Sequence, residues 1–234
     1  NLSRRGFLRS GAAVGATSAL LGMMGATTAS AKPGRGPRQA ENNGGYGPLE
    51  PAPGGELLLP AGFSYGASGH TGTPMSGGRP TPGMHDGMAA VAGDDGRIRL
   101  VRNHEQSEGA AFASPSYEAV AAGCTTTMVF DPEKMELVDT YPSLTGTIRN
   151  CAGGPTPWGS WLSCEETFTG LDVDTPHGYV FEVPAGADGP VDPVPYKEMG
   201  RFTHEAVAID EASGIVYQTE DRGSAGFYRF VPNK

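Results

Sequence analysis

Two cysteines and two adjacent glutamates lie within residues 150–166, which run NCAGGPTPWGSWLSCEE. Carboxylates are hard ligands that suit Ca²⁺, whereas a thiolate is a soft ligand that suits a transition metal. The cysteines are Cys151 and Cys164, and the acids are Glu165 and Glu166. This mixture of residue types predicts a metal site.

The elements that must position these side chains follow from the same stretch. Pro155 and Pro157 fix φ and exclude a helix, so we expect a rigid loop that begins at Cys151. From residue 159 to residue 164, Trp161 and Ser163 alternate with Leu162 and Cys164, and this period of two predicts a strand. That strand delivers the two glutamates to its end.

The cysteine count leaves two states open. Cys124, Cys151 and Cys164 are an odd number, so an exported protein would keep at least one thiol unpaired. A Cys151–Cys164 disulfide is one possibility. An unpaired Cys151 that binds a metal beside carboxylates is the other.

Composition predicts a β-rich fold. The chain has 234 residues, of which 36 are Gly and 20 are Pro, and only 18% are charged. The glycines separate β-rich segments and do not form a tract, which is typical of many short strands joined by tight turns. The first strand pair is expected between residues 57–60 and 62–65.

The N-terminus predicts an export signal. Arg4 and Arg5 precede an apolar run of small residues, and residues 29–31 read Ala-Ser-Ala, which fits a twin-arginine signal cleaved after Ala31. Its partner would be the twin-arginine translocation machinery, and the protein would be periplasmic or extracellular without a stable membrane anchor. Residues 32–60 are then a linker and residues 61–234 the folded domain.

Net charge excludes one class of partner. Residues 1–31 hold three of the 17 basic residues and none of the 26 acidic ones, so the rest of the chain has a formal charge of −12. Such a surface repels nucleic acid. We expect a monomer that acts on small molecules.

An internal repeat decides the expected fold. Residues 85–91 resemble residues 204–209, and each segment leads through a turn into a strand that ends in acids, at 98–105 and 215–221. The middle copy is the stretch at 150–166, with Cys151 in the place of Asp86 and Glu205. The third strand of each copy contains a phenylalanine, and these fall at Phe130, Phe181 and Phe230.

The spacing of the phenylalanines is near fifty residues, which is typical of a β-propeller blade. A β-sandwich would also give many short strands, but it predicts no acids at equivalent positions. We therefore expect an all-β fold that is a partial β-propeller of about three blades. Because propellers need four to eight blades, the chain is expected to lack C-terminal blades of a longer ring.

The repeat predicts that acids converge near the propeller axis. Several unpaired carboxylates in one place repel one another unless cations neutralise them. The candidates at strand starts and strand ends are Asp86, Cys151, Glu205, Glu105, Glu165, Glu166, Glu220 and Asp221.

Other polar and aromatic residues surround these acids. We expect His104 and His204 to orient the neighbouring glutamates by hydrogen bonding, in preference to binding a metal directly. Arg149 is the best candidate for a contact with an anionic substrate. Trp158 and Trp161 are expected to pack between blades.

Four segments together resemble the PhoX-type alkaline phosphatases: residues 103–105, 150–166, 201–210 and 217–222. The resemblance covers roughly residues 56–234. It implies a β-propeller exported by the twin-arginine route that hydrolyses phosphomonoesters with a cluster of Ca²⁺ and Fe³⁺. The PhoX-type proteins continue with further blades, so we expect this chain alone to be a poor phosphatase.

The resemblance also implies roles for residues. Cys151 would be the thiolate ligand of iron, with Glu205 and either Glu165 or Glu166 as carboxylate ligands. Further ligand candidates are Glu105, Glu220 and Asp221. Two other functions stay open, a noncatalytic calcium-binding propeller and a propeller hydrolase of another specificity, such as a lactonase or phytase-like enzyme.

Overall fold

The computed structural model describes residues 45–169 and 171–233. The predicted signal at residues 1–31 lies outside the described residues. The chain divides into two compact units, Asn1–Tyr65 and Gly66–Lys234, which we describe separately.

The described part of the first unit forms a β-hairpin. Strand β1 (Leu49–Pro51) pairs in antiparallel fashion with β2 (Leu58–Pro60), within the segment predicted as a linker. The predicted pairing of residues 57–60 with 62–65 is therefore wrong. One residue between two strands is too short for a hairpin turn, whereas Gly54 and Gly55 adopt positive φ and close the turn between β1 and β2.

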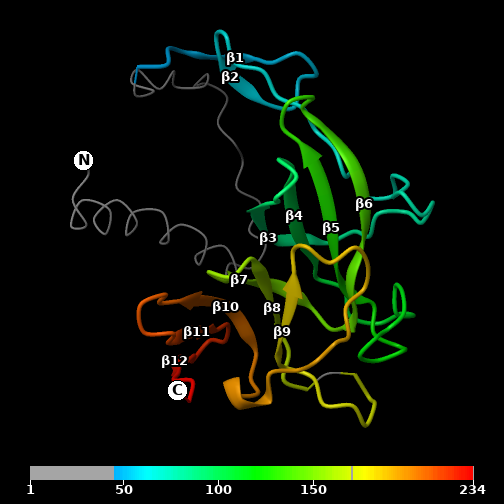
Figure 1. The fold of residues 1–234 in the computed structure, drawn as a ribbon, viewed down its shortest axis with the longest axis vertical. Helices are drawn as coiled ribbons and strands as arrows, with labels where there is room; N and C mark the ends of the chain where they lie inside the picture. The colour runs from blue at the N-terminus through cyan, green and yellow to red at the C-terminus, as the bar shows by residue number, and fades with distance from the viewer. Residues whose placement is uncertain (1–44, 170, 234) are drawn as a thin grey trace, which may run out of the picture. The chain divides into compact units, whose positions relative to one another are not determined.

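The described residues of the second unit are all-β, with antiparallel sheets and one short 3-10 helix, η1 (Lys197–Met199) (Figure 1). The first sheet contains β3 (His85–Ala92), β4 (Ile98–His104), β5 (Gly123–Asp131) and β6 (Glu136–Thr147). The second contains β7 (Asn150–Pro155), β8 (Ser160–Glu165) and β9 (Val180–Pro184). The third contains β10 (His204–Ile209), β11 (Val216–Glu220) and β12 (Phe227–Phe230).

These sheets correspond to the three predicted copies of the repeat, and β6 is a fourth strand that the sequence pattern did not indicate. The expectation of a rigid loop from Cys151 is wrong, because Asn150–Pro155 is the first strand of the second sheet. Pro155 is tolerated there because β7 is an edge strand of its sheet. The sheets do not close into a ring within the described residues.

The first strands of the three sheets lie next to one another, with β7 between β3 and β10 (Figure 1). Glycines allow this approach. A Cβ on Gly87 of β3 would lie 2.7 Å from Cα of Ala152, and a Cβ on Gly154 of β7 would lie 2.1 Å from the carbonyl oxygen of Val207. The inner strands thus meet through their backbones.

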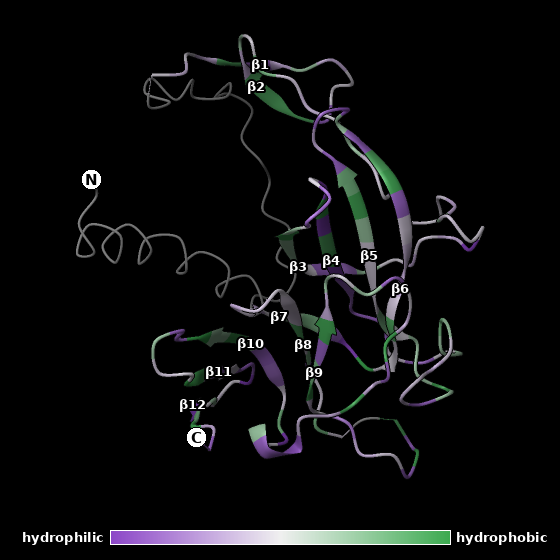
Figure 2. Ribbon diagram, in the orientation of Figure 1, coloured by the Kyte–Doolittle hydropathy of each residue, from purple (hydrophilic) through white to green (hydrophobic). Residues whose placement is uncertain are grey.

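Two clusters of buried apolar side chains lie in the second unit, and the strands carry both hydrophobic and hydrophilic residues (Figure 2). Strand β8 contributes side chains to both hydrophobic clusters, because successive side chains of a strand point to opposite faces. Trp161 packs with Val101 of the first sheet, whereas Leu162 packs with Val207 of the third.

The two tryptophans behave differently. Trp161 is 4% exposed and lies between sheets, as predicted. The same prediction for Trp158 is wrong, since it is 63% exposed and donates from Nε1 to Glu182 at 2.6 Å. Trp158 lies in the turn before β8, outside the alternation that buries Trp161.

Among the described residues, no helix has the length and apolar character that crossing a bilayer requires.

Gly154→Ala tests the contact between inner strands. We expect the free energy of unfolding to fall by about 2–4 kcal/mol, since the new methyl group must displace the backbone of β10. Urea denaturation measures the change. Gly186→Ala is the matched control, because a Cβ there meets no atom within 4 Å, and it should change stability by no more than about 0.5 kcal/mol. Equal effects of the two substitutions would contradict this account of the packing.

Candidate metal centre

Each inner strand carries a β-bulge at the same point. The pairing register shifts between His85 and Met88 in β3, between Asn150 and Gly153 in β7, and between His204 and Val207 in β10. The first residues inside these bulges are Asp86, Cys151 and Glu205. The structure therefore places these three residues at equivalent positions, as the repeat predicts.

A second equivalent set follows the second strand of each sheet. Glu105, Glu166 and Asp221 come directly after β4, β8 and β11. Their backbone N–H groups donate to the residue just before the inner strand of the same sheet. The acceptors are the carbonyls of Met84 at 2.8 Å, Arg149 at 2.9 Å and Thr203 at 3.1 Å.

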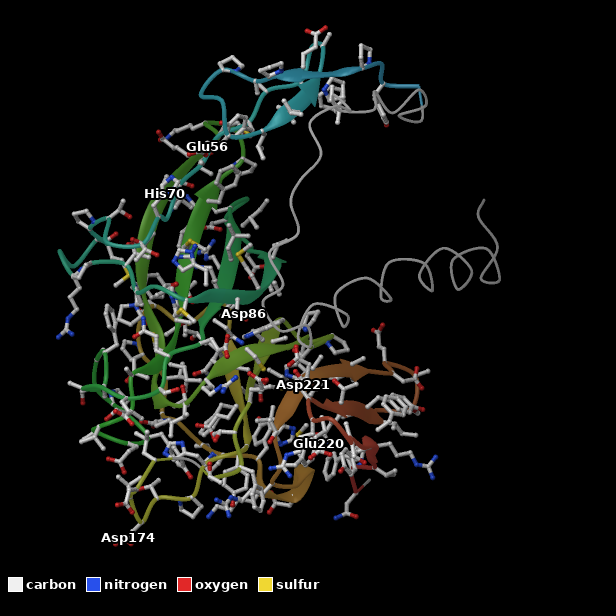
Figure 3. All side chains as sticks on the ribbon, turned by 180° about the vertical axis from the view of Figure 1, so that it is seen from behind. Glu56, His70, Asp86, Asp174, Glu220 and Asp221 are labelled. Atoms are coloured by element: carbon white, nitrogen blue, oxygen red, sulfur yellow. The ribbon has the colours of Figure 1, made fainter. Side chains whose placement is uncertain are left out.

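Acids from both sets converge. One carboxylate oxygen each from Glu166, Glu205 and Asp221 lies within 4.8 Å of the others. Burial raises the pKa of Glu205, and repulsion from Glu166, Asp221 and Asp86 raises it further. Asp86 and Asp221 come from the first and third sheets and face the same region (Figure 3).

Arg149 joins two of the acids. Its Nη2 donates to Glu105 at 3.0 Å and to Glu166 at 2.6 Å. These carboxylates hold the pKa of Arg149 above its usual range, and the guanidinium opposes the burial that raises the pKa of Glu166. The backbone of Arg149 has φ of 50°, and its N–H donates to Gln106 at 2.7 Å.

A positive φ is costly for a non-glycine residue and persists only where surrounding contacts impose it. The backbone hydrogen bonds to Gln106 and Glu166 supply such contacts for Arg149. The side chain of Arg149 reaches Glu105 after β4 of the first sheet and Glu166 after β8 of the second.

Glu165 does not join this group. It is fully buried, and its carboxylate accepts hydrogen bonds from the backbone N–H groups of Ile148, Gly178 and Tyr179 at 2.9, 2.7 and 3.1 Å and from Nδ1 of His177 at 2.7 Å. Four donors occupy the acceptor sites of a carboxylate. Of the predicted pair, only Glu166 points toward the other acids, because adjacent residues of a strand face opposite sides.

The side chain of Glu220 also points away from the group formed by Glu166, Glu205 and Asp221. Its Oε2 accepts from the N–H of Gly226 at 3.0 Å and from the hydroxyl of Tyr228 at 2.9 Å, which ties β11 to β12. Its neighbour Asp221 is the member of the pair that reaches the acidic group.

The expectation that His104 and His204 orient the neighbouring acids is wrong. Both rings are fully buried, and burial lowers the pKa of each to about 4. His104 contacts the carbonyl of Gly83 at 2.9 Å and the hydroxyl of Thr126 at 2.8 Å. His204 contacts the carbonyl of Gly200 at 3.4 Å. Each ring points to the opposite face of its strand from the glutamate that follows it.

Cys151 lies beside the acidic group with its thiol free. The structure forms no disulfide among the three cysteines, all of which it describes. Sγ of Cys151 donates to the carbonyls of His204 at 3.3 Å and Glu205 at 3.5 Å. Burial, with the nearby Cys164 and Glu205, holds the thiol pKa well above its usual range.

The donor set fits a metal ion. Three carboxylate oxygens within 4.8 Å of one another supply hard ligands, and repulsion from Glu166 and Asp221 adds to the burial that raises the pKa of Glu205. Cys151 adds a soft donor beside Glu205. Arg149 is the cation that the described residues place against this group.

The family model of the alkaline phosphatase PhoX matches residues 44–139 and 122–234. The chain belongs to this family. Searches of curated proteins and of solved structures gave no match. Membership in the PhoX family supports a phosphatase hydrolase that depends on metal.

Sequence reasoning missed two buried residues near the candidate metal centre. His177 holds Glu165, and Asn103 contacts the bulge at Cys151. Asn103 lies directly before His104 in a motif that resembles the family, yet a lone asparagine gives no sign of its partners. No periodic pattern marks His177, which lies outside the strands.

The described residues also line an open apolar pocket of about 320 Å³ between the second and third sheets. Leu162, Val216 and Phe230 are among its lining residues, whereas Glu166, Glu205 and Asp221 are not. This pocket is separate from the candidate metal centre.

Glu165→Gln and Glu166→Gln separate the roles of the adjacent acids. In chelator-treated protein, we expect Glu165→Gln to lower the free energy of unfolding by about 2–4 kcal/mol, because the new amide cannot accept all four hydrogen bonds. Glu166→Gln should change stability by less than about 1 kcal/mol, and it should weaken Ca²⁺ binding. Urea denaturation and isothermal titration calorimetry measure the two effects. The reverse order in either measurement would refute the assignment.

Proposed function

We propose that the protein is an exported phosphatase of the PhoX family that hydrolyses phosphomonoesters with bound Ca²⁺ and Fe³⁺. The observation that carries this proposal is the convergence of Glu166, Glu205 and Asp221 beside Arg149 and Cys151 in a chain of that family. Hydrolysis of phosphomonoesters needs positive charge around the phosphate, and an acidic protein acquires such charge by binding cations.

The architecture that best fits these observations is a β-propeller. The three sheets are equivalent in strand order, in the position of the bulge and in the acids that follow the second strand. Their first strands lie side by side, which is the relation of inner strands around a propeller axis. The proposed export by the twin-arginine route rests on the sequence of residues 1–31 alone. It places the protein in the periplasm or outside the cell.

Residues of both equivalent sets would hold the cations. Glu166, Glu205 and Asp221 are the carboxylates whose oxygens converge, with Asp86 and Glu105 beside them. Cys151 would supply the thiolate for iron. Bound cations polarise phosphoryl oxygens and stabilise the attacking and leaving oxygens of an in-line displacement.

Arg149 would bind the substrate phosphate. Its side chain is 44% exposed, and only Nη2 is bonded within the described residues. The remaining N–H donors are placed to bind phosphate oxygens. Glu105 and Glu166 both accept from Nη2 and hold the guanidinium in place, so the phosphate meets an oriented donor.

Metal removal tests the class of enzyme. Because the isolated chain is expected to be a poor phosphatase, the test uses the protein as its host makes it, which we expect to contain calcium and iron by elemental analysis and to hydrolyse p-nitrophenyl phosphate. Chelation should abolish hydrolysis, and Ca²⁺ should restore it. Cys151→Ser should lose iron, because a hydroxyl is a poor replacement for a thiolate. Calcium binding with no hydrolysis of any phosphomonoester would instead indicate a noncatalytic propeller.

Arg149→Lys tests the phosphate contact. We expect kcat/KM for p-nitrophenyl phosphate to fall about 10²- to 10³-fold, because a lysine keeps the charge but loses the planar pair of donors. The control is Arg97→Lys, which alters an arginine whose pairing with Asp95 lies at the surface. Unchanged kcat/KM in Arg149→Lys would exclude a substrate contact at this position.

A further inference from the structure

The side chain of Asn103 crosses from the first sheet to the second. It is fully buried on β4, and its Nδ2 donates to the carbonyls of Cys151 at 3.2 Å and Ala152 at 2.8 Å. Its Oδ1 accepts from Nε1 of Trp161 and from the hydroxyl of Ser163, both at 2.9 Å. These partners occupy both donors and both acceptor sites of the amide.

The two carbonyls that Asn103 contacts are those of the β7 bulge. The ladder between β7 and β8 passes directly from Asn150 to Gly153, so the two residues between them have no partner in the ladder. A buried carbonyl without a donor is costly. Asn103 supplies both donors from the neighbouring sheet.

The next interface between sheets lacks this arrangement. The position equivalent to Asn103 in the second sheet is Cys164, directly before the last residue of β8. There no amide holds the β10 bulge among the described residues: the hydroxyl of Thr219 in the same sheet accepts from the N–H of Ala206 at 3.0 Å and donates to its carbonyl at 3.4 Å, and the thiol of Cys151 contacts the carbonyl of Glu205 at 3.5 Å. Of these two bulges, only that of β7, which contains Cys151, has both carbonyls bonded by a side-chain amide from the neighbouring sheet.

We propose that Asn103 is a positioning residue that fixes the direction of the Cys151 thiol. With both bulge carbonyls held, the Cα–Cβ bond of Cys151 has one orientation, and Sγ lies 3.3 Å from the carbonyl of His204 at the edge of the acidic group. That this orientation helps Cys151 to bind a metal rests on the proposed function. The orientation itself is independent of that function.

Thiol reactivity in the full chain tests the proposal without metal. Asn103→Asp keeps the shape of the side chain but replaces both donors with a carboxylate oxygen that faces two carbonyls. Asn103→Ala is a second variant without the added charge, and it decides the test if the first fails to fold. Gln218→Glu is the matched control, because Gln218 is 2% exposed and its amide donates to the carbonyl of Met199 at 3.1 Å.

The measurement is the rate at which N-ethylmaleimide modifies each cysteine of chelator-treated protein, resolved by peptide mass spectrometry. We expect Asn103→Asp to raise the rate at Cys151 by about ten- to a hundredfold, because the bulge opens locally. The rates at Cys124 and Cys164 should stay unchanged, as should all three in Gln218→Glu. An unchanged rate at Cys151, or an equal rise at all three cysteines, would overturn the proposal.

Binding of Co²⁺ gives a second readout, through the absorption band of a thiolate bound to this ion. We expect Asn103→Asp to weaken the affinity measured from this band by about tenfold or more, with Ca²⁺ binding unchanged in calorimetry. An unaltered Co²⁺ affinity would refute a role for Asn103 in ligand placement. If the wild-type protein shows no such band, the thiolate role of Cys151 in the proposed function fails, whereas the maleimide rates still decide whether Asn103 positions the thiol.

Discussion

Backbone contact between the inner strands is the constraint on which the candidate site depends. Gly87 packs on Ala152 and Gly154 packs on Val207, so β3, β7 and β10 approach more closely than side chains would allow. This distance brings acids from three sheets within reach of one another. With larger residues at the two glycines the sheets would separate, and the carboxylates would face solvent as isolated groups.

The bulges direct side chains of the three neighbouring strands to one region. An inserted residue in an antiparallel pair leaves the ladder and changes the direction of its side chain. Because the three bulges lie at equivalent points, the same displacement occurs in each sheet and directs Asp86, Cys151 and Glu205 to one region. Repetition of one local irregularity thus builds a composite site that no single sheet contains.

The sequence predicted most of the strands, because alternation and the fifty-residue repeat are properties of the chain itself. It could not distinguish Glu165 from Glu166, or Glu220 from Asp221. Adjacent residues face opposite sides of a strand. Which of the two points toward the other acids depends on a bulge in the partner strand, and the amino-acid sequence does not mark the position of that bulge. The opposite-face rule speaks against His104 and His204 as direct metal ligands from sequence alone, but the sequence does not show that their partners are the carbonyls of Gly83 and Gly200 and not the acids.

Charge balance shows why this group suits more than one cation. Asp86, Glu105, Glu166, Glu205 and Asp221 contribute five carboxylates when ionised, and Arg149 contributes one positive charge, so a formal charge of −4 is left. One divalent ion would leave half of that charge uncompensated in a partly buried region, where repulsion is stronger than in water. Two divalent ions, or a divalent and a trivalent ion with an added thiolate, would neutralise it. Arg149 already holds Glu105 and Glu166, so the oxygens that most need compensation are those of Glu205 and its neighbours, next to the thiol of Cys151.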